Sequence, residues 1–166
     1  RFLSEAIESA CQQTYDNTEV IVVDDGSSDN SRDVIASFED RITPVYKENG
    51  GQASAFNAGF AASKGALILF LDADDYLYPE AVEQILAAWS SEPDAVKLHF
   101  LLDGIDGVGD PLGYTYPAQG KYLGRGDVVA QLLKRGVYGV APTSGNALAR
   151  NALDKIFPIE EDTYRI

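Results

Sequence analysis

The residues best placed to do chemistry are three carboxylates, Asp72, Asp74 and Asp75, in the sequence Asp-Ala-Asp-Asp. They directly follow the apolar run 66–71, which predicts a buried β-strand. Carboxylates crowded at the end of a strand repel one another, and a cation between them relieves the repulsion. Mg²⁺ takes oxygen ligands, often one or two carboxylates together with substrate phosphates. The sequence therefore predicts a site for a divalent cation and a diphosphate. The alternative is a solvated acidic turn before Pro79.

A second acidic pair, Asp24 and Asp25, follows the β-branched run 20–23 and precedes Gly26. Both acidic motifs thus lie at the carboxyl ends of predicted strands. In parallel α/β sheets, ligands bind beyond these carboxyl ends. We therefore expect Asp24 and Asp25 to contribute to the same binding region, with Gly26 permitting a tight turn near the ligand. The alternative is a cluster that only orders the loop and caps a helix.

Strands and helices alternate through the first hundred residues. The predicted strands are 20–23, 42–46, 66–71 and 95–100, and the predicted helices are 2–11, 28–38, 52–63 and 79–89. Ser28 or Asp29 is expected to cap the second helix, and Gly65 to close the third. This alternation predicts an α/β fold with a Rossmann-like mixed, mostly parallel sheet and helices on both faces.

The second half of the chain is less regular. Residues 103–120 are rich in glycine and predict a long loop, with a short hairpin or disorder as alternatives. A helical pattern follows at 127–134, then a short strand or turn at 144–148 and a helix from Asn151. Long loops in compact domains are often binding loops or lids.

Composition excludes several classes of function. The net charge is −13, which argues against a general nucleic-acid binder and against docking on anionic lipid. The single cysteine, Cys11, excludes an internal disulfide and is expected to pack in the core. The longest apolar run has about six residues, far below the ~20 that span a membrane. We expect a cytoplasmic protein, with membrane association through parts outside this segment left open.

Four segments, in this order, resemble family 2 glycosyltransferases with the GT-A fold. They are residues 19–29, 48–59, 65–75 and 144–150. The resemblance implies a transferase that uses a nucleotide-diphospho-sugar of the UDP or GDP type, with inversion at the anomeric carbon. It also implies an acceptor that is a saccharide, a lipid-linked saccharide or a protein, as in polysaccharide biosynthesis.

The resemblance assigns roles to particular residues. Asp25 would accept a hydrogen bond from the base, and Asp24 would support the turn or the ribose. Asp74 would ligate Mn²⁺ or Mg²⁺, and Asp72 would contact the sugar, the ribose or the metal. The residues implied in donor binding are Asp24, Asp25, Gly26, Gly51, Asn57 and Asp72. Asp162 is the candidate catalytic base, with a residue beyond Ile166 as the alternative.

The resemblance covers a single domain, residues 1–166. Residues 1–101 would form the nucleotide-sugar-binding half and residues 102–166 part of the acceptor half. We expect a further strand before the first helix and further residues at the C-terminal end. Two alternatives remain. A sugar-nucleotide nucleotidyltransferase would carry a glycine-rich basic phosphate loop near its start. A non-catalytic partner-binding domain would not need Asp25 and Asp74.

Overall fold

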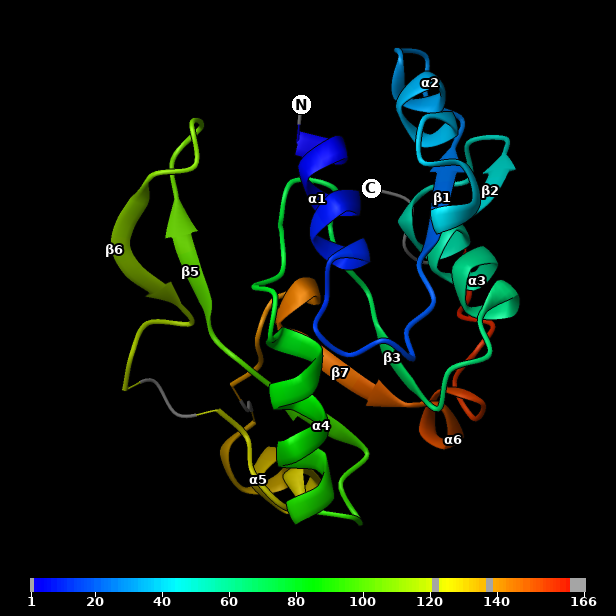
Figure 1. Ribbon diagram of the computed structural model, residues 1–166. Helices are drawn as coiled ribbons and strands as arrows, with labels where there is room; N and C mark the ends of the chain where they lie inside the picture. Colours follow the sequence, from blue (N-terminus) through cyan, green and yellow to red (C-terminus); the bar gives the residue numbers. More distant parts are fainter. Residues whose placement is uncertain (1, 121–122, 137–138, 162–166) are drawn as a thin grey trace.

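The computed structural model describes residues 2–120, 123–136 and 139–161, and strands and helices alternate through its first hundred residues (Figure 1). The elements in this part are α1 Phe2–Cys11, β1 Ile21–Asp25, α2 Ser31–Ala36, the 3-10 helix η1 Glu39–Arg41, β2 Thr43–Lys47, α3 Gln52–Ala62, β3 Leu67–Leu69, α4 Ala81–Ser91 and β4 Lys97–His99. Every strand and helix predicted for this part is present, with shifted bounds.

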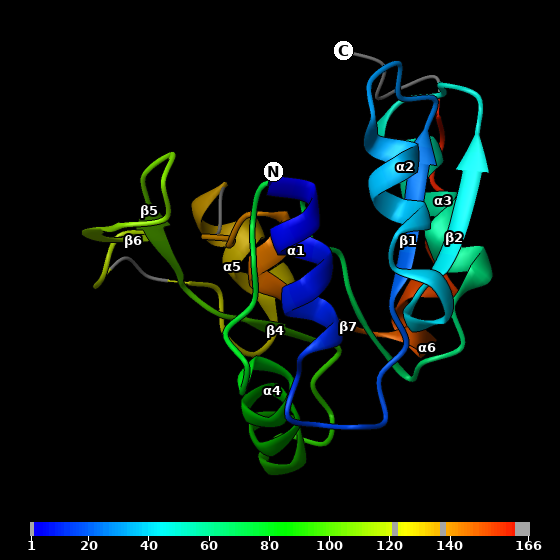
Figure 2. The same ribbon diagram turned by 45° about the horizontal axis from the view of Figure 1, so that its top comes forward.

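The second part begins with a hairpin. Its elements are β5 Leu102–Ile105, β6 Pro111–Tyr116, α5 Val128–Arg135, the 3-10 helix η2 Thr143–Gly145, β7 Asn146–Ala149 and α6 Arg150–Leu153. The predicted loop 103–120 thus contains the hairpin β5–β6, which lies across α1 from the β1–β2 pair in both views (Figures 1 and 2). No helix within the described ranges is long and apolar enough to cross a membrane.

The strands form three hydrogen-bonded groups. β1 and β2 pair in parallel, which places Asp24 opposite Tyr46 and Asp25 opposite Lys47. β7 lies between β3 and β4 and is antiparallel to both, so β3 and β4 run in the same direction on either side of it. The predicted mixed α/β architecture is present, and the antiparallel strand sits in the middle of its group rather than at an edge.

Helices cover both faces of β1. Successive side chains of a strand point to opposite faces. Val22 packs against a buried cluster that contains Ile7 of α1 and Ile35 of α2. On the other face, α3 approaches so closely that a Cβ on Gly59 would lie 3.3 Å from Cγ2 of Val23. This arrangement confirms the expectation of helices on both faces and fixes the direction in which β1 delivers its carboxyl end.

A gap in strand pairing separates β1 from β3 within the described chain. β1 pairs with β2 on its far side and β3 with β7 on its far side, so the open edges of β1 and β3 face each other (Figure 1). A cavity of about 590 Å³ lies between them, lined by Ile21 from one edge and by β3 from the other. Open edges present unpaired N–H and C=O groups. The expected strand before α1 stays a prediction.

Two helix ends differ from the sequence expectation. α2 begins at Ser31 and its N-cap is Asn30, so neither Ser28 nor Asp29 is the N-cap. The Asp29 carboxylate accepts a 3.0 Å hydrogen bond from the N–H of Ser31, the first residue of the helix. α3 gives way to extended backbone at Ser63, with φ −80° and ψ 154°. Gly65 is therefore not its C-terminal glycine, because the chain has already left the helix two residues earlier.

Candidate functional site

Asp25 ends β1 and ties it to the turn before α3. Its carboxylate accepts hydrogen bonds from the backbone N–H groups of Gly50 (3.0 Å) and Gly51 (2.7 Å) and from the Lys47 ammonium. Burial raises the pKa of Asp25, but the bonds from Lys47, Gly50 and Gly51 outweigh it, and the pKa lies below its ordinary value. An ionised carboxylate offers about four lone-pair sites. The Gly50 N–H also lies 3.1 Å from Oδ2, so these three donors make four hydrogen bonds to Asp25, whose side chain is still 19% exposed.

Asp24 anchors the loop that follows β1. It is only 3% exposed, and its carboxylate accepts hydrogen bonds from the Ser27 N–H (3.2 Å) and from Nε of Arg32 (2.6 Å). Burial raises the pKa of Asp24, but the hydrogen bonds from Ser27 and the charge of Arg32 bring it below its ordinary value. Asp24 therefore holds this loop against α2.

Gly26 and Gly51 both have left-handed backbone. Gly26 has φ +80°, and a Cβ there would lie 2.7 Å from the backbone nitrogen of Asn49. Gly51 has φ +84°, and a Cβ there would meet no atom within 4 Å. The loop after β1 thus packs directly on the turn before α3, and the absent side chain at Gly26 permits this contact.

The second acidic motif forms a turn after β3. The Asp75 N–H donates to the Asp72 carbonyl (3.1 Å), and the Asp72 N–H donates to Oγ of Ser144 (2.9 Å). Asp72 and Asp75 are half-buried and Asp74 is exposed. Burial raises the pKa of Asp72, and the charges of Asp75 and Asp74 raise it further. Asp74 and Asp75 therefore lie close enough to Asp72 to disfavour its charged form.

This turn offers a partial set of metal ligands. Within the ranges that the structure describes, no three His, Cys, Asp or Glu side chains converge to hold a metal ion by themselves. Asp72 and Asp74 supply two carboxylates, which is the number that Mg²⁺ commonly takes when phosphates complete its shell. A cation would also relieve the repulsion that raises the pKa of Asp72. The donor set fits Mn²⁺ or Mg²⁺ held jointly with a diphosphate.

The two acidic motifs share one side of the fold. β1 and β3 run in the same direction, and the loops at their carboxyl ends lie on the same side (Figure 1). In α/β folds this is the side on which ligands bind. The arrangement gives one region an acceptor for a ring N–H at Asp25 and oxygen ligands at Asp72 and Asp74.

Asn57 of α3 contacts the end of the described chain. Its Nδ2 donates to the Ile159 carbonyl (2.9 Å) and to Oε1 of Glu161 (3.1 Å), and its Oδ1 accepts from the Ile159 N–H (2.8 Å). These bonds hold the segment 159–161 against α3. The role of Asn57 in nucleotide binding stays a prediction. Asp162, the candidate base, lies outside the described residues, directly after this held segment.

Two basic residues whose charge suits a diphosphate have partners inside the protein. Lys47 bonds to Asp25. Nε of Arg150 donates to the Gly65 carbonyl (2.6 Å), and its guanidinium carbon lies 4.8 Å from the centre of the Phe60 ring. Arg150 thus secures the connection between α3 and β3. Ser144, by contrast, has a site role that the sequence did not assign, although it belongs to the matching segment 144–150.

Sequence comparison places the chain among glycosyltransferases. The profile of glycosyl transferase family 2 matches residues 1–157. An uncharacterized glycosyltransferase of Nostoc sp. is 41% identical over 171 residues, which cover 100% of this chain and 52% of the relative. Glycosyltransferase GlyG of Streptococcus pneumoniae is 38% identical over 89 residues, 51% of this chain and 30% of the relative. The chain spans about half the length of its Nostoc relative.

Solved structures of S. aureus TarS share the fold. TarS matches with a TM-score of 0.69 and 23% identity, over 95% of this chain and 27% of TarS. TarS 1–349 in complex with UDP-GlcNAc matches with a TM-score of 0.68 and 21% identity, over 92% of this chain and 43% of that chain. The likeness confirms the predicted fold class.

Proposed function

The chain belongs to glycosyl transferase family 2, and we propose on this basis that it transfers a sugar from a nucleotide-diphospho-sugar to an acceptor hydroxyl, with inversion at the anomeric carbon. One observation carries the proposal. The two acidic motifs, at Asp25 and at Asp72–Asp75, lie at the carboxyl ends of β1 and β3 on the same side of the fold. Such a pairing gives one ligand two attachment points, a ring N–H and a diphosphate.

The donor is proposed to be of the UDP type, with the GDP type as the tested alternative. TarS 1–349 has been solved in complex with UDP and with UDP-GlcNAc. In this chain, the partly exposed carboxylate of Asp25 suits the imide N–H of uracil, because an ionised carboxylate only accepts. Gly26 and Gly51 leave the backbone near Asp25 without side chains. Asp24 supports the same loop from the interior.

The chemistry is proposed to use carboxylates in two different roles. Asp74 and Asp72 would hold Mn²⁺ or Mg²⁺, which when bound supplies Lewis-acid stabilisation to the leaving diphosphate. Asp162 would take the proton from the acceptor hydroxyl while that oxygen bonds to the anomeric carbon and the bond to the diphosphate breaks. Asn57 would position the chain just before this base through its bonds to residues 159–161.

Calorimetric titration of the protein with UDP and with GDP, each with and without Mn²⁺, tests this function. We expect UDP to bind in a Mn²⁺-dependent manner, and Asp74→Ala to remove this dependence. Asp94→Ala is the matched control, because Asp94 is an exposed carboxylate outside the acidic motifs. Mn²⁺-dependent binding that persists in Asp74→Ala would refute the metal assignment, and binding of neither nucleotide would refute the donor class.

A further inference from the structure

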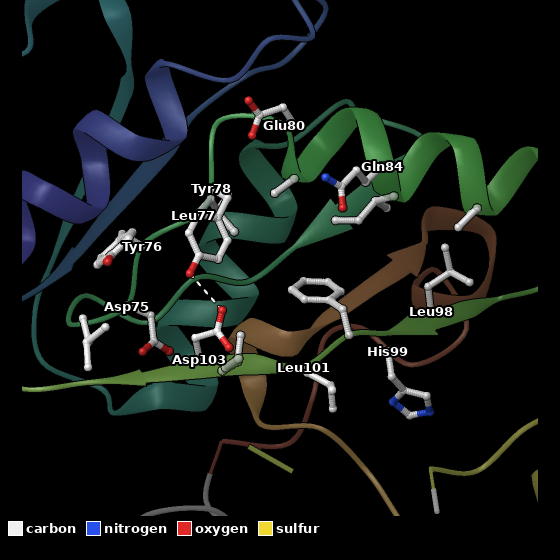
Figure 3. A pocket seen from close by; sticks show the side chains of 16 residues that line it. Asp75, Tyr76, Leu77, Tyr78, Glu80, Gln84, Leu98, His99, Leu101 and Asp103 are labelled. Carbon is white, nitrogen blue, oxygen red and sulfur yellow. Dashed lines mark hydrogen bonds between the residues drawn. The ribbon is translucent and has the colours of Figure 1, made fainter. Parts of the chain in front are cut away.

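Two tyrosine rings contact adjacent residues of β5. The Tyr78 hydroxyl donates a 2.8 Å hydrogen bond to Oδ2 of Asp103 (Figure 3). The Tyr114 ring from β6 lies over Gly104, where a Cβ would come within 2.4 Å of the ring. Gly104 therefore makes room for that ring, as glycine in a strand does where another group approaches closely. Tyr78 and Tyr114 are nevertheless 57% and 56% exposed.

The backbone beneath Tyr78 is also held in place. The side chain of Gln13 donates to the Tyr78 carbonyl (3.0 Å) and accepts from the Val82 N–H (3.0 Å). Oγ of Ser9 accepts from the Leu77 N–H (3.0 Å). A large exposed aromatic ring on a backbone fixed from both sides loses little conformational freedom when a ligand covers it.

Tyr78 lines two adjoining cavities, and Tyr114 lines the second of them. One, of about 420 Å³, extends from Asp75 between α4 and β5 (Figure 3). The other, of about 570 Å³, lies along the hairpin. Tyr76, Tyr78 and Asp103 line both cavities. We call the two together the tyrosine cleft. It begins at Asp75, one residue from the proposed metal ligand Asp74.

We propose that the tyrosine cleft binds the acceptor, and that the acceptor is a saccharide. This inference rests on the proposed function, because only a transferase needs an acceptor beside its donor. The C–H face of a pyranose ring packs on an aromatic face, and its hydroxyls donate to carboxylates at the rim. Tyr78 and Tyr114 supply the faces, and Asp75 and Asp103 supply the acceptors. The opening at Asp75 directs one end of the saccharide toward the acidic turn.

The charges around the cleft favour a saccharide over a lipid surface. Asp75, Glu80 and Asp103 line the first cavity. His99 is the single basic residue in its lining, which contains no lysine or arginine. Burial lowers the pKa of His99, and the charge of Lys97 lowers it further, so the imidazole is neutral near pH 7. Carboxylates repel anionic headgroups but accept from neutral hydroxyls. A neutral, hydroxyl-rich ligand therefore suits the cleft.

The test is a glycan microarray of neutral and anionic oligosaccharides, probed with fluorescently labelled protein. We expect the wild type to bind a subset of neutral glycans, and Tyr78→Ala and Tyr114→Ala to bind them about tenfold or more weakly. Tyr78→Phe keeps the ring and should retain most of the binding. Tyr15→Ala is the matched control, since Tyr15 is an exposed tyrosine outside the cleft.

The same preparations are titrated with UDP and Mn²⁺ so that the two proposals fail separately. UDP binding without glycan binding, or glycan binding that Tyr78→Ala retains, overturns the acceptor cleft and leaves the transferase standing. Glycan binding that Tyr78→Ala weakens, without binding of UDP or GDP, refutes the transferase and leaves a saccharide-binding cleft. Binding to phosphatidylcholine vesicles in place of glycans, lost in Tyr78→Ala, also overturns the saccharide assignment.

Discussion

The hydroxyl of Ser144 accepts a hydrogen bond of 2.9 Å from the backbone N–H of Asp72, although 72 residues separate the two in sequence. Ser144 is 1% exposed and precedes β7, the strand that pairs with β3. The second half of the chain thus fixes the first residue of the acidic turn. The proposed metal ligands depend on a residue that no acidic motif contains.

Removing this hydroxyl should destabilise the acidic turn. Ser144→Ala leaves the Asp72 N–H without its acceptor, which costs roughly 1–3 kcal/mol at a buried position. We expect urea denaturation to show this loss and calorimetry to show weaker Mn²⁺-dependent UDP binding. Ser91→Ala, on the exposed face of α4, should change neither quantity. Unaltered UDP affinity in Ser144→Ala would show that the turn forms without Ser144.

Two constraints act on Gly26, a left-handed backbone and a close contact with Asn49, and two variants can separate their effects on stability. Gly26→Ala meets a left-handed backbone and a contact of 2.7 Å with the Asn49 nitrogen. Gly109→Ala meets only the first, since Gly109 has φ +95° and open space around it. The left-handed backbone costs about 1–2 kcal/mol per residue. We expect thermal denaturation to show a loss for Gly109→Ala near that value and a larger one for Gly26→Ala. Equal losses would mean that the loop shifts away from Asn49 at no cost.

Asp24 should make stability depend on pH in the acid range. Its pKa is depressed in the folded protein, so its contribution is complete above the unfolded pKa of about 3.9 and is lost as the pH falls through the folded value. The melting temperature of the wild type should therefore fall below about pH 4 more steeply than that of Asp24→Asn. Asp94→Asn should follow the wild type. Parallel curves for Asp24→Asn and wild type would contradict the role of the Arg32 and Ser27 contacts.

Asn57 should separate transfer from donor binding. Asn57→Ala removes the bonds that hold residues 159–161 beside the candidate base Asp162. We expect kcat for transfer to fall about tenfold or more, as misplacement of a catalytic group predicts, with the calorimetric affinity for UDP unchanged. A loss of UDP affinity with normal kcat would instead place Asn57 in the nucleotide pocket.

The sequence predicted the positions of helices and strands better than it predicted which strands pair with each other. The helices 2–11 and 52–62 and the strands that end at the two acidic motifs follow from local patterns of apolar residues, which a sequence displays directly. The position of β7 between β3 and β4 does not, because β7 pairs with one strand about eighty residues away and with another about fifty residues away. The four residues of β7 show too short a pattern of apolar residues to predict which strands lie beside it.

The same limit applies within the site. Carboxylates at strand ends are visible in the sequence, so the positions of Asp25 and Asp72 after predicted strands could be read from it. What their neighbours do is not visible, because a side chain's partner depends on the fold. Arg150 carries a charge that suits a diphosphate, yet its Nε donates to the Gly65 carbonyl. A turn glycine suggested a helix end at Gly65, yet the helix has ended before it.

The facing open edges of β1 and β3 have a consequence for cooperativity. Hydrogen bonds join β1 to β2 and β3 to β7, but within the described chain none of the strand pairings joins β1 to β3. Proteins open in contiguous units, and backbone amides exchange with solvent deuterium as each unit opens. The amides of β1–β2 and those of β3–β7–β4 should therefore exchange with different opening free energies. A strand that paired with both edges would join the two groups of strands into one unit, whose amides would share a single opening free energy.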